Sequence, residues 1–257
     1  IIIALKTDTF VRSTDMPPEM NFYHAGWKTV VMNVSDLVAK GIPPKYFLIS
    51  LSVPGNYTVE NVMHVMQGVK DACNEYNIKF LGGDTSEADD LVLSGFTVGI
   101  LQDKRNLISR RGIHVGDILA VTGNFGYTAS ALRILLDKVE VPKKLANIFK
   151  KTLFEPKARL KEGLALAETY AVSACIDSSD GLLASLNELL RVNPVGFLIE
   201  RLPYSKEVEE FSKISNIPLE DLVLNGGEEY ELVLTIKPNK LDDAIKAIKK
   251  VGGNLIV

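Results

Sequence analysis

The chain has 257 residues, of which 46% are hydrophobic and 24% charged, and its formal net charge is −3 at pH 7. This composition is typical of a soluble globular protein with one large domain or, as we expect here, two domains of ordinary size. The small negative charge excludes a broad basic surface for nucleic acid and a polybasic anchor for a membrane.

Strands and helices are predicted to alternate through the first hundred residues. The opening Ile1-Ile2-Ile3 is too short for a signal peptide or a membrane span, and the lack of an initiator Met indicates that the chain starts inside a longer sequence. Apolar residues at helical spacing predict a helix over 26–40, ended by Gly41. We also expect strands at 1–11, 46–53, 78–81 and 91–101, a loop with two prolines after residue 11, and a helix at 58–76 capped by Thr58.

The polar segment 103–116 predicts a joint between two domains, which we place at 1–108 and 109–257. Beyond it we expect strands at 117–122, 172–176, near Phe197, at 232–236 and at 254–257, and helices at 127–136, 141–154, 158–170, from 182 onward and at 242–251. This interleaving favours α/β or α+β layers. The two cysteines, Cys73 and Cys175, lie far apart in apolar segments, so we expect both to be buried free thiols of an intracellular protein.

Two aspartates follow the predicted strand 172–176 at its end. Asp177 and Asp180 precede an amphipathic helix, and Asp180 occupies the expected N-cap position. A cap explains one carboxylate but not two, because carboxylates this close repel each other unless a proton or a cation lies between them. A hard divalent ion such as Mg²⁺ would meet that need, and a turn with a solvated Asp177 is the structural alternative.

Asp8, Asp36 and Asp84 stand in similar settings, beside small hydroxyl residues, glycine or the polar edge of a helix. Each one alone fits a turn or a cap, and together they predict an acidic site for several metal ions. The glycine pairs 82–83 and 123/126 would allow the backbone to approach a phosphate. No P-loop, GxGxxG or HExxH motif is present, and the three histidines share no metal-ligand spacing, so we expect them to be structural or solvated.

Four motifs in this order give the chain a family resemblance. They are Asn33-Val34-Ser35-Asp36, Gly82-Gly83-Asp84-Thr85, Asp177-Ser178-Ser179-Asp180-Gly181-Leu182 and Gly226-Gly227-Glu228-Glu229-Tyr230-Glu231-Leu232. Over nearly the whole chain they resemble the thiamine-monophosphate kinases. These belong to the ATP-binding superfamily that also holds aminoimidazole ribonucleotide synthetase, selenophosphate synthetase and the hydrogenase-maturation dehydratase.

The resemblance implies a two-domain α/β and α+β fold of the aminoimidazole ribonucleotide synthetase type, with N-terminal strands that form the interface of a homodimer. It implies site residues in three groups. The Mg²⁺ ligands would be Thr7, Asp8, Asp36, Asp84, Asp177 and Asp180. The ATP contacts would be Gly83, Asp84, Arg110 and Ser179, with Arg111 as an alternative to Arg110, and the contacts to thiamine monophosphate would be Asp15 and Glu228.

The chain departs from the family pattern at four places. The family's Gly-Asp-Asp motif, which supplies a further metal ligand, would lie upstream of Ile1. Lys6 stands where the family has a small hydroxyl residue that helps to hold a metal, so the number of metal ions is open. Asp15 replaces a histidine that many members have, and Glu229 replaces an aspartate.

The implied reaction is the ATP- and Mg²⁺-dependent phosphorylation of thiamine monophosphate to thiamine diphosphate in the cytoplasm. The acceptor is a phosphate that is already ionised, so the reaction needs neutralised charge and alignment rather than a general base, and no catalytic base is assigned. The alternatives are another ATP-dependent reaction of the superfamily, such as ring closure or selenophosphate synthesis, or a protein that only binds nucleotide or thiamine phosphate. Neither nucleic acid nor a membrane is expected as a partner.

Overall fold

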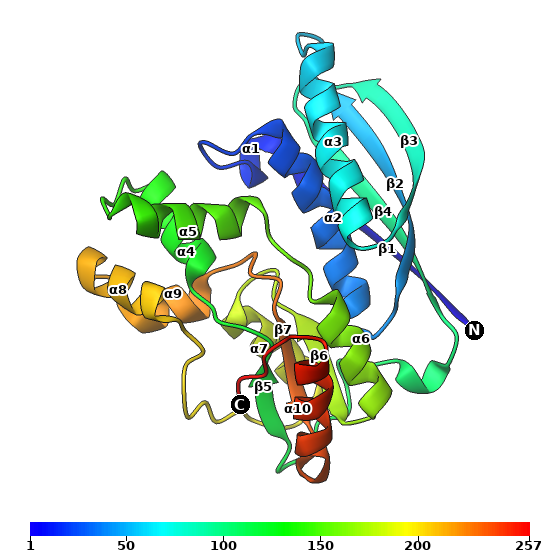
Figure 1. The fold of residues 1–257 in the computed structure, drawn as a ribbon, viewed down its shortest axis with the longest axis vertical. Coiled ribbons are helices and arrows are strands. Elements are labelled where there is room, and N and C mark those ends of the chain that lie inside the picture. Colours follow the sequence, from blue (N-terminus) through cyan, green and yellow to red (C-terminus); the bar gives the residue numbers. More distant parts are fainter.

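The computed structural model describes residues 1–257, which form two lobes that each contain one sheet (Figure 1). The N-terminal sheet has the strand order β1-β4-β2-β3. Its strands are β1 (Ile2–Val11), β2 (Pro44–Val53), β3 (Lys79–Glu87) and β4 (Val92–Leu101). β4 pairs antiparallel with β1 and β2, whereas β2 and β3 are parallel. β1 and β3 are therefore the two edges.

Only one face of this sheet is covered, by α2 (Phe22–Val38) and α3 (Val59–Glu75) (Figure 1). Residues that point toward the helices are buried, such as Phe47 and Leu93, because side chains alternate between the faces of a strand. The opposite face exposes apolar side chains, and Ile3 and Leu5 on β1 are 67% and 64% exposed. The chain thus leaves an apolar sheet face without a cover.

Two glycines allow α2 and α3 to pack closely. A Cβ atom at Gly26 would lie 2.0 Å from the Val65 carbonyl oxygen, and one at Gly68 would lie 1.9 Å from the Tyr23 carbonyl oxygen. Both distances are far below van der Waals contact, so any side chain at either position must push the helices apart. This contact fixes α2, which carries Asp36, against the rest of the lobe.

We therefore expect Gly68→Ala to lower the free energy of unfolding by about 2 kcal/mol, because overpacking outweighs the gain in helix propensity. Gly196→Ala is the control, since no atom lies within 4 Å of a Cβ built there. Urea denaturation of both variants measures the difference. Equal midpoints for the two variants would contradict the packing argument.

The C-terminal lobe has a three-stranded antiparallel sheet in the order β5-β7-β6. Its strands are β5 (Ile118–Val121), β6 (Val172–Asp177) and β7 (Leu232–Ile236). Its helices are α4 (Tyr127–Leu135), α5 (Lys143–Phe154), α6 (Leu160–Thr169), α7 (Leu182–Val192), α8 (Lys206–Ser215), α9 (Leu219–Asn225) and α10 (Leu241–Lys250).

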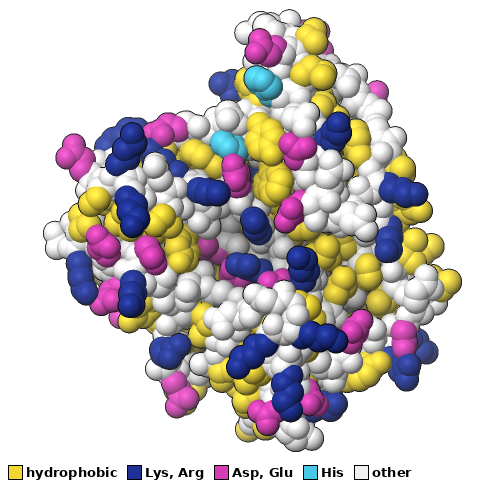
Figure 2. Space-filling model, in the orientation of Figure 1, with side chains coloured by type: hydrophobic (Ala, Val, Ile, Leu, Met, Phe, Trp, Pro, Cys, Tyr) yellow, Lys and Arg dark blue, Asp and Glu magenta, His cyan; other side chains and the backbone are white.

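The lobes are joined by a segment that contains the short 3-10 helix η1 (Lys104–Asn106). One hydrophobic cluster of 51 buried residues includes members from both lobes, so they pack against each other rather than hang on a flexible linker. Figure 2 shows that the visible face is hollowed near its centre, where basic and acidic side chains border the depression. The exact boundary at residues 108 and 109 stays a prediction.

Most predicted elements are confirmed, and the differences have local causes. Residues 12–15 form a helical turn, α1 (Arg12–Asp15), rather than a loop. α2 starts four residues earlier than predicted, because Asn21 and His24 make a reciprocal capping box. β3 continues through the glycine motif and ends at Glu87. No strand forms near Phe197, and the predicted strand 254–257 is a single bridge between Val121 and Ile256.

Two further findings concern side-chain environment. Both cysteines are buried free thiols, as predicted, and burial raises the pKa of each to about 12. None of the helices combines the length and the apolar character that a membrane crossing requires.

Candidate active site

A polar cavity of about 740 Å³ lies where the two lobes meet. β1, α1 and α2 contribute one wall, and the β6–α7 connection and the loop before β7 contribute the other. Seven of its seventeen lining residues are acidic and two are basic. The cavity brings together eight of the predicted site residues, namely Asp8, Asp15, Asp36, Arg110, Asp177, Ser179, Asp180 and Glu228. Residues more than 200 positions apart in sequence thus meet in one place.

Asp177 is the last residue of β6 and is only 5% exposed. Burial, together with the nearby charge of Asp36, raises the pKa of its carboxyl to about 6. Asp177 forms no ion pair within 4 Å, and Lys6 and Arg110 both contact Asp36 instead. The charge of Lys40 lowers the pKa of Asp177 from a greater distance, but burial outweighs this effect, so a bound cation would still stabilise the ionised carboxylate.

The predicted capping role of Asp180 is wrong. The N-cap of α7 is Gly181, and no side chain caps the helix. Asp180 lies one residue too early to reach the first free N–H groups, and its carboxylate faces the cavity with only the Ser179 hydroxyl as a partner, at 3.4 Å. Its charge is thus available to a ligand.

Lys6 places an ammonium group among these carboxylates. Its Nζ lies 2.5 Å from Asp36 Oδ2 and 3.4 Å from Asp8 Oδ2. Burial lowers the pKa of Lys6, but the hydrogen bond and charge of Asp36 and the charge of Asp8 outweigh that effect, so the pKa is raised. In this structure no three acidic, histidine or cysteine side chains are arranged around one point as a metal site.

The loop 226–231 is anchored through the side chains of Glu229 and Glu231. Glu228 and Tyr230 have positive φ angles of 65° and 52°, which are strained for residues with a side chain. Glu229 is buried and accepts hydrogen bonds from the backbone N–H groups of Gly126 and Thr128, and burial raises its pKa to about 8. Glu231 forms a buried ion pair with Arg159 and also accepts from the Thr122 hydroxyl. These contacts fix Glu228 at the cavity wall.

Lys28 contacts two of the predicted site residues, and the sequence analysis missed it. It is completely buried, and its Nζ lies 2.5 Å from Glu228 Oε1 and 3.2 Å from the Asp15 carbonyl oxygen. The ammonium also lies 5.5 Å from the centre of the Phe10 ring. A lysine inside the apolar stripe of a predicted helix is the only signal that could have indicated it. Lys28 links the two lobes through the predicted substrate residues.

The Lys28–Glu228 pair predicts an asymmetric cost of truncation. Glu228→Ala strands a fully buried ammonium and should lower the free energy of unfolding by about 3 kcal/mol or more. Lys28→Met should cost less, because Glu228 is 29% exposed and can be hydrated, and Met can pack against Phe10. Urea denaturation of both single variants and of the double variant gives the coupling energy. A larger cost for Lys28→Met would contradict this assignment.

Three predicted site residues do not line the cavity. Asp84 is exposed on β3 and pairs with Ser50, on the uncovered face of the sheet and at the edge opposite β1. Gly83 lies in the same strand, where a Cβ atom would come 1.7 Å from the Ile49 carbonyl oxygen, so strand pairing alone requires a glycine there. Thr7 donates its hydroxyl proton to the Gly95 carbonyl oxygen at 2.9 Å. Arg110, not Arg111, lines the cavity.

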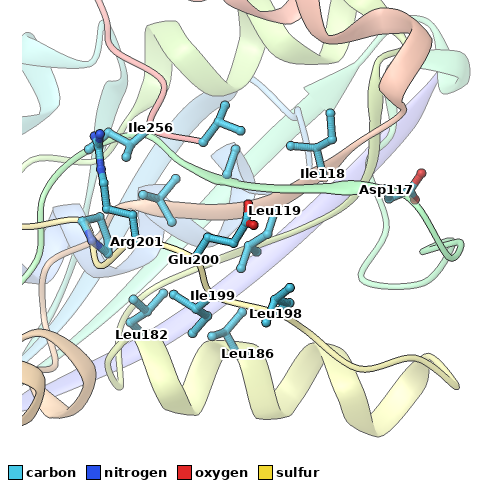
Figure 3. A pocket seen from close by; sticks show the side chains of 14 residues that line it. Asp117, Ile118, Leu119, Leu182, Leu186, Leu198, Ile199, Glu200, Arg201 and Ile256 are labelled. Atoms are coloured by element: carbon cyan, nitrogen blue, oxygen red, sulfur yellow. The ribbon is translucent and has the colours of Figure 1, made fainter.

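A second cavity, of about 350 Å³, lies between β5 and α7 (Figure 3). Leu119, Leu182, Leu186 and Ile199 point into it, and ten of its fourteen lining residues are hydrophobic. It contains none of the predicted site residues. The acidic cavity is the better candidate, because its carboxylates can bind cations that neutralise phosphate, which apolar side chains cannot do.

Comparisons with known proteins identify the family of this chain. The family model of the AIR synthase related protein, N-terminal domain, matches residues 1–101, and that of the C-terminal domain matches residues 114–256. The chain is 37% identical to the thiamine-monophosphate kinase of Nitrosopumilus maritimus, over 99% of this chain and 79% of that protein. The corresponding protein of Pyrococcus abyssi is 35% identical, over 98% and 79% of the two chains.

A solved structure of ThiL, the thiamine monophosphate kinase of Aquifex aeolicus, complexed with AMPPCP and TMP, superposes with a TM-score of 0.85. It is 30% identical, and the match covers 93% of this chain and 76% of that one.

Proposed function

Because this chain belongs to the AIR synthase related family, and within it to the thiamine-monophosphate kinases, we propose that it transfers a phosphoryl group from ATP to thiamine monophosphate and so makes thiamine diphosphate. One observation of this molecule carries the proposal. The cavity between the lobes gathers Asp8, Asp36, Asp177 and Asp180 beside Glu228. These carboxylates can bind the cations that a reaction between two polyanions requires.

The kinds of side chain in the cavity suit magnesium, while no three of them are gathered around one point in this structure. All four aspartates offer carboxylate oxygens, the ligands that Mg²⁺ prefers, and Asp177 is buried and forms no ion pair within 4 Å. We propose that Asp36, Asp177 and Asp180 hold Mg²⁺, with Asp8 beside them. Bound there, the ion would neutralise phosphate charge and align donor and acceptor.

The protein's own groups would position the substrates. Thiamine carries a permanently positive thiazolium ring, and the carboxylates of Asp15 and Glu228 suit such a cation. Asp15 is held by the Val11 N–H at 2.7 Å and Glu228 by Lys28, so both are preorganised. Arg110 and Ser179 offer N–H and O–H donors to phosphate oxygens. No side chain needs to remove a proton from the acceptor.

We further propose that the protein acts as a homodimer in which the uncovered sheet faces pack together. Exposed Ile3 and Leu5, and Leu81 on β3, supply an apolar contact of the kind that association buries. Within one chain, Asp84 is three strands away from Asp8, roughly 14 Å at ordinary strand spacing, and on the other face of the sheet. A partner seated on that face would allow Asp84 to complete its neighbour's site. Two free thiols favour the cytoplasm as the location.

The decisive experiment measures products. Purified protein with ATP, Mg²⁺ and thiamine monophosphate should form ADP and thiamine diphosphate in equal amounts, measured by coupled ADP detection and by fluorescence after oxidation. ADP without thiamine diphosphate would indicate another reaction of the superfamily. Binding of thiamine monophosphate without either product would leave a non-catalytic binder and contradict the proposal.

A further inference from the structure

Lys6 stands at a place where two predicted metal ligands from different elements converge. Lys6 and Asp8 are two residues apart on β1, so their side chains share the face that α2 covers. Asp36 reaches the same point from α2. The ammonium lies 2.5 Å from Asp36 Oδ2 and 3.4 Å from Asp8 Oδ2, so it contacts both carboxylates.

The basic groups of the cavity are distributed unevenly. Lys6 and Arg110 are the only ones, and both approach Asp36, Lys6 at 2.5 Å and Arg110 at 4.0 Å. Asp177 and Asp180, on the opposite wall, form no ion pair within 4 Å, and the charge of Lys40 acts on Asp177 only from a greater distance. The positive charge that lines the cavity is therefore concentrated at Asp36.

Geometry also favours a fixed role for Lys6. Only 28% of the Lys6 side chain is exposed, and Lys6 belongs to β1, which pairs with β4 along its whole length. The two carboxylates that contact its ammonium group come from a strand and a helix. An ammonium group held in this way is covalently attached to the chain and cannot leave the site by dissociation.

Resting on the proposed kinase function, we propose that Lys6 is a tethered cation that takes the place of one divalent ion between Asp8 and Asp36. The divalent ions that this chain binds would then be confined to the side of Asp36, Asp177 and Asp180. A chain with a small hydroxyl residue at this position would need a further divalent ion to balance the same two carboxylates. The protein would then need to bind fewer metal ions from solution before each turnover.

The test counts bound metal. Mn²⁺ serves as the probe, with AMPPCP as the nucleotide, and free Mn²⁺ is measured by electron paramagnetic resonance while total Mn²⁺ is varied. The variants are Lys6→Thr, which suits a β-strand, and Lys6→Gln, which keeps most of the side-chain length. Lys45→Thr is the control, because Lys45 is an exposed lysine on β2 outside the cavity.

We expect Lys6→Thr and Lys6→Gln to bind about one more Mn²⁺ per chain than the wild type, and Lys45→Thr to match the wild type. An unchanged count in folded Lys6 variants, as judged by circular dichroism, would overturn the proposal. Loss of Mn²⁺ and AMPPCP binding in both variants would also overturn it, since Lys6 would then be a ligand-binding group.

Product formation by the wild type is measured separately. If the wild type makes no thiamine diphosphate, the proposed function is wrong, and the Mn²⁺ count still decides the role of Lys6.

Discussion

Asp177→Asn is expected to lower the turnover number at least about 100-fold while leaving the protein folded, because the change removes a charge that the reaction uses and the fold does not. Asp177 ends β6 and contributes to the cavity wall from a buried position. Asparagine has nearly the same shape, so packing against the strand is retained. Only the negative charge and one acceptor oxygen are lost.

The stability of the same variant gives an independent readout. In the folded protein the pKa of Asp177 is raised to about 6, above its ordinary value of 3.8. The folded state therefore holds its proton more tightly than the unfolded chain, and stability falls as the pH rises from about 4 to about 6. Above that range the ionised, buried carboxylate destabilises the metal-free fold. Asp177→Asn should thus unfold at an equal or higher temperature than the wild type at pH 7.5 without Mg²⁺.

Glu188→Gln is the matched control for Asp177→Asn. Glu188 also lines the cavity and loses the same charge, but it is solvated and pairs with Arg191 at 2.7 Å. It should keep nearly full activity. Thermal unfolding with and without Mg²⁺, and turnover at limiting Mg²⁺, compare the two variants. Near-normal turnover of Asp177→Asn at limiting Mg²⁺ would show that Asp177 does not bind the metal ion.

Local signals in the sequence account for most of the fold. Thr58 with Asn61 gives a capping box at the predicted start of α3, and the apolar spacing of α2 survives in the structure. α8 was missed although Ser205 caps it and Val208 and Phe211 lie at helical spacing, while α9 has only seven residues, too few to show a helical period. The strand expected near Phe197 does not form, because the segment pairs with no other strand: Val195 and Phe197 pack against the core, and Leu198 and Ile199 are exposed.

Site residues could be predicted where a sequence motif indicates both the position of the residue and the side of the element toward which its side chain points. Asp177 and Asp180 follow a buried strand, and both reach the cavity. Lys28 was not predictable, because its burial depends on a partner 200 residues away, in the loop that carries Glu228. For Asp84 the motif identifies the family but not the position of the residue in the structure. Asp84 lies in the sheet because β3 continues through the glycines, and a prediction that ends the strand at residue 81 misses this.

Asp84 leads to the second large expected effect. If it completes the partner's cavity, each active site takes Asp84 from one chain and Asp177 from the other. Asp84→Asn and Asp177→Asn should each be nearly inactive as homodimers. When the two variants are mixed and allowed to exchange chains, half of the dimers are mixed, and one of the two sites in each mixed dimer is intact. Activity should therefore return to about a quarter of the wild-type value.

The pair Asp36→Asn and Asp177→Asn is the control for this mixing experiment. Both residues line the cavity of the same chain, so every site in a mixed dimer lacks one of them and no activity should return. Leu5→Glu adds a test of the interface, since a charge on the exposed sheet face should yield monomers by light scattering and abolish the recovery. Val59→Glu, equally exposed but on α3, should leave the dimer intact. Absence of recovery with Asp84→Asn, in dimers shown to exchange chains, would place Asp84 in its own chain's site or outside the site altogether.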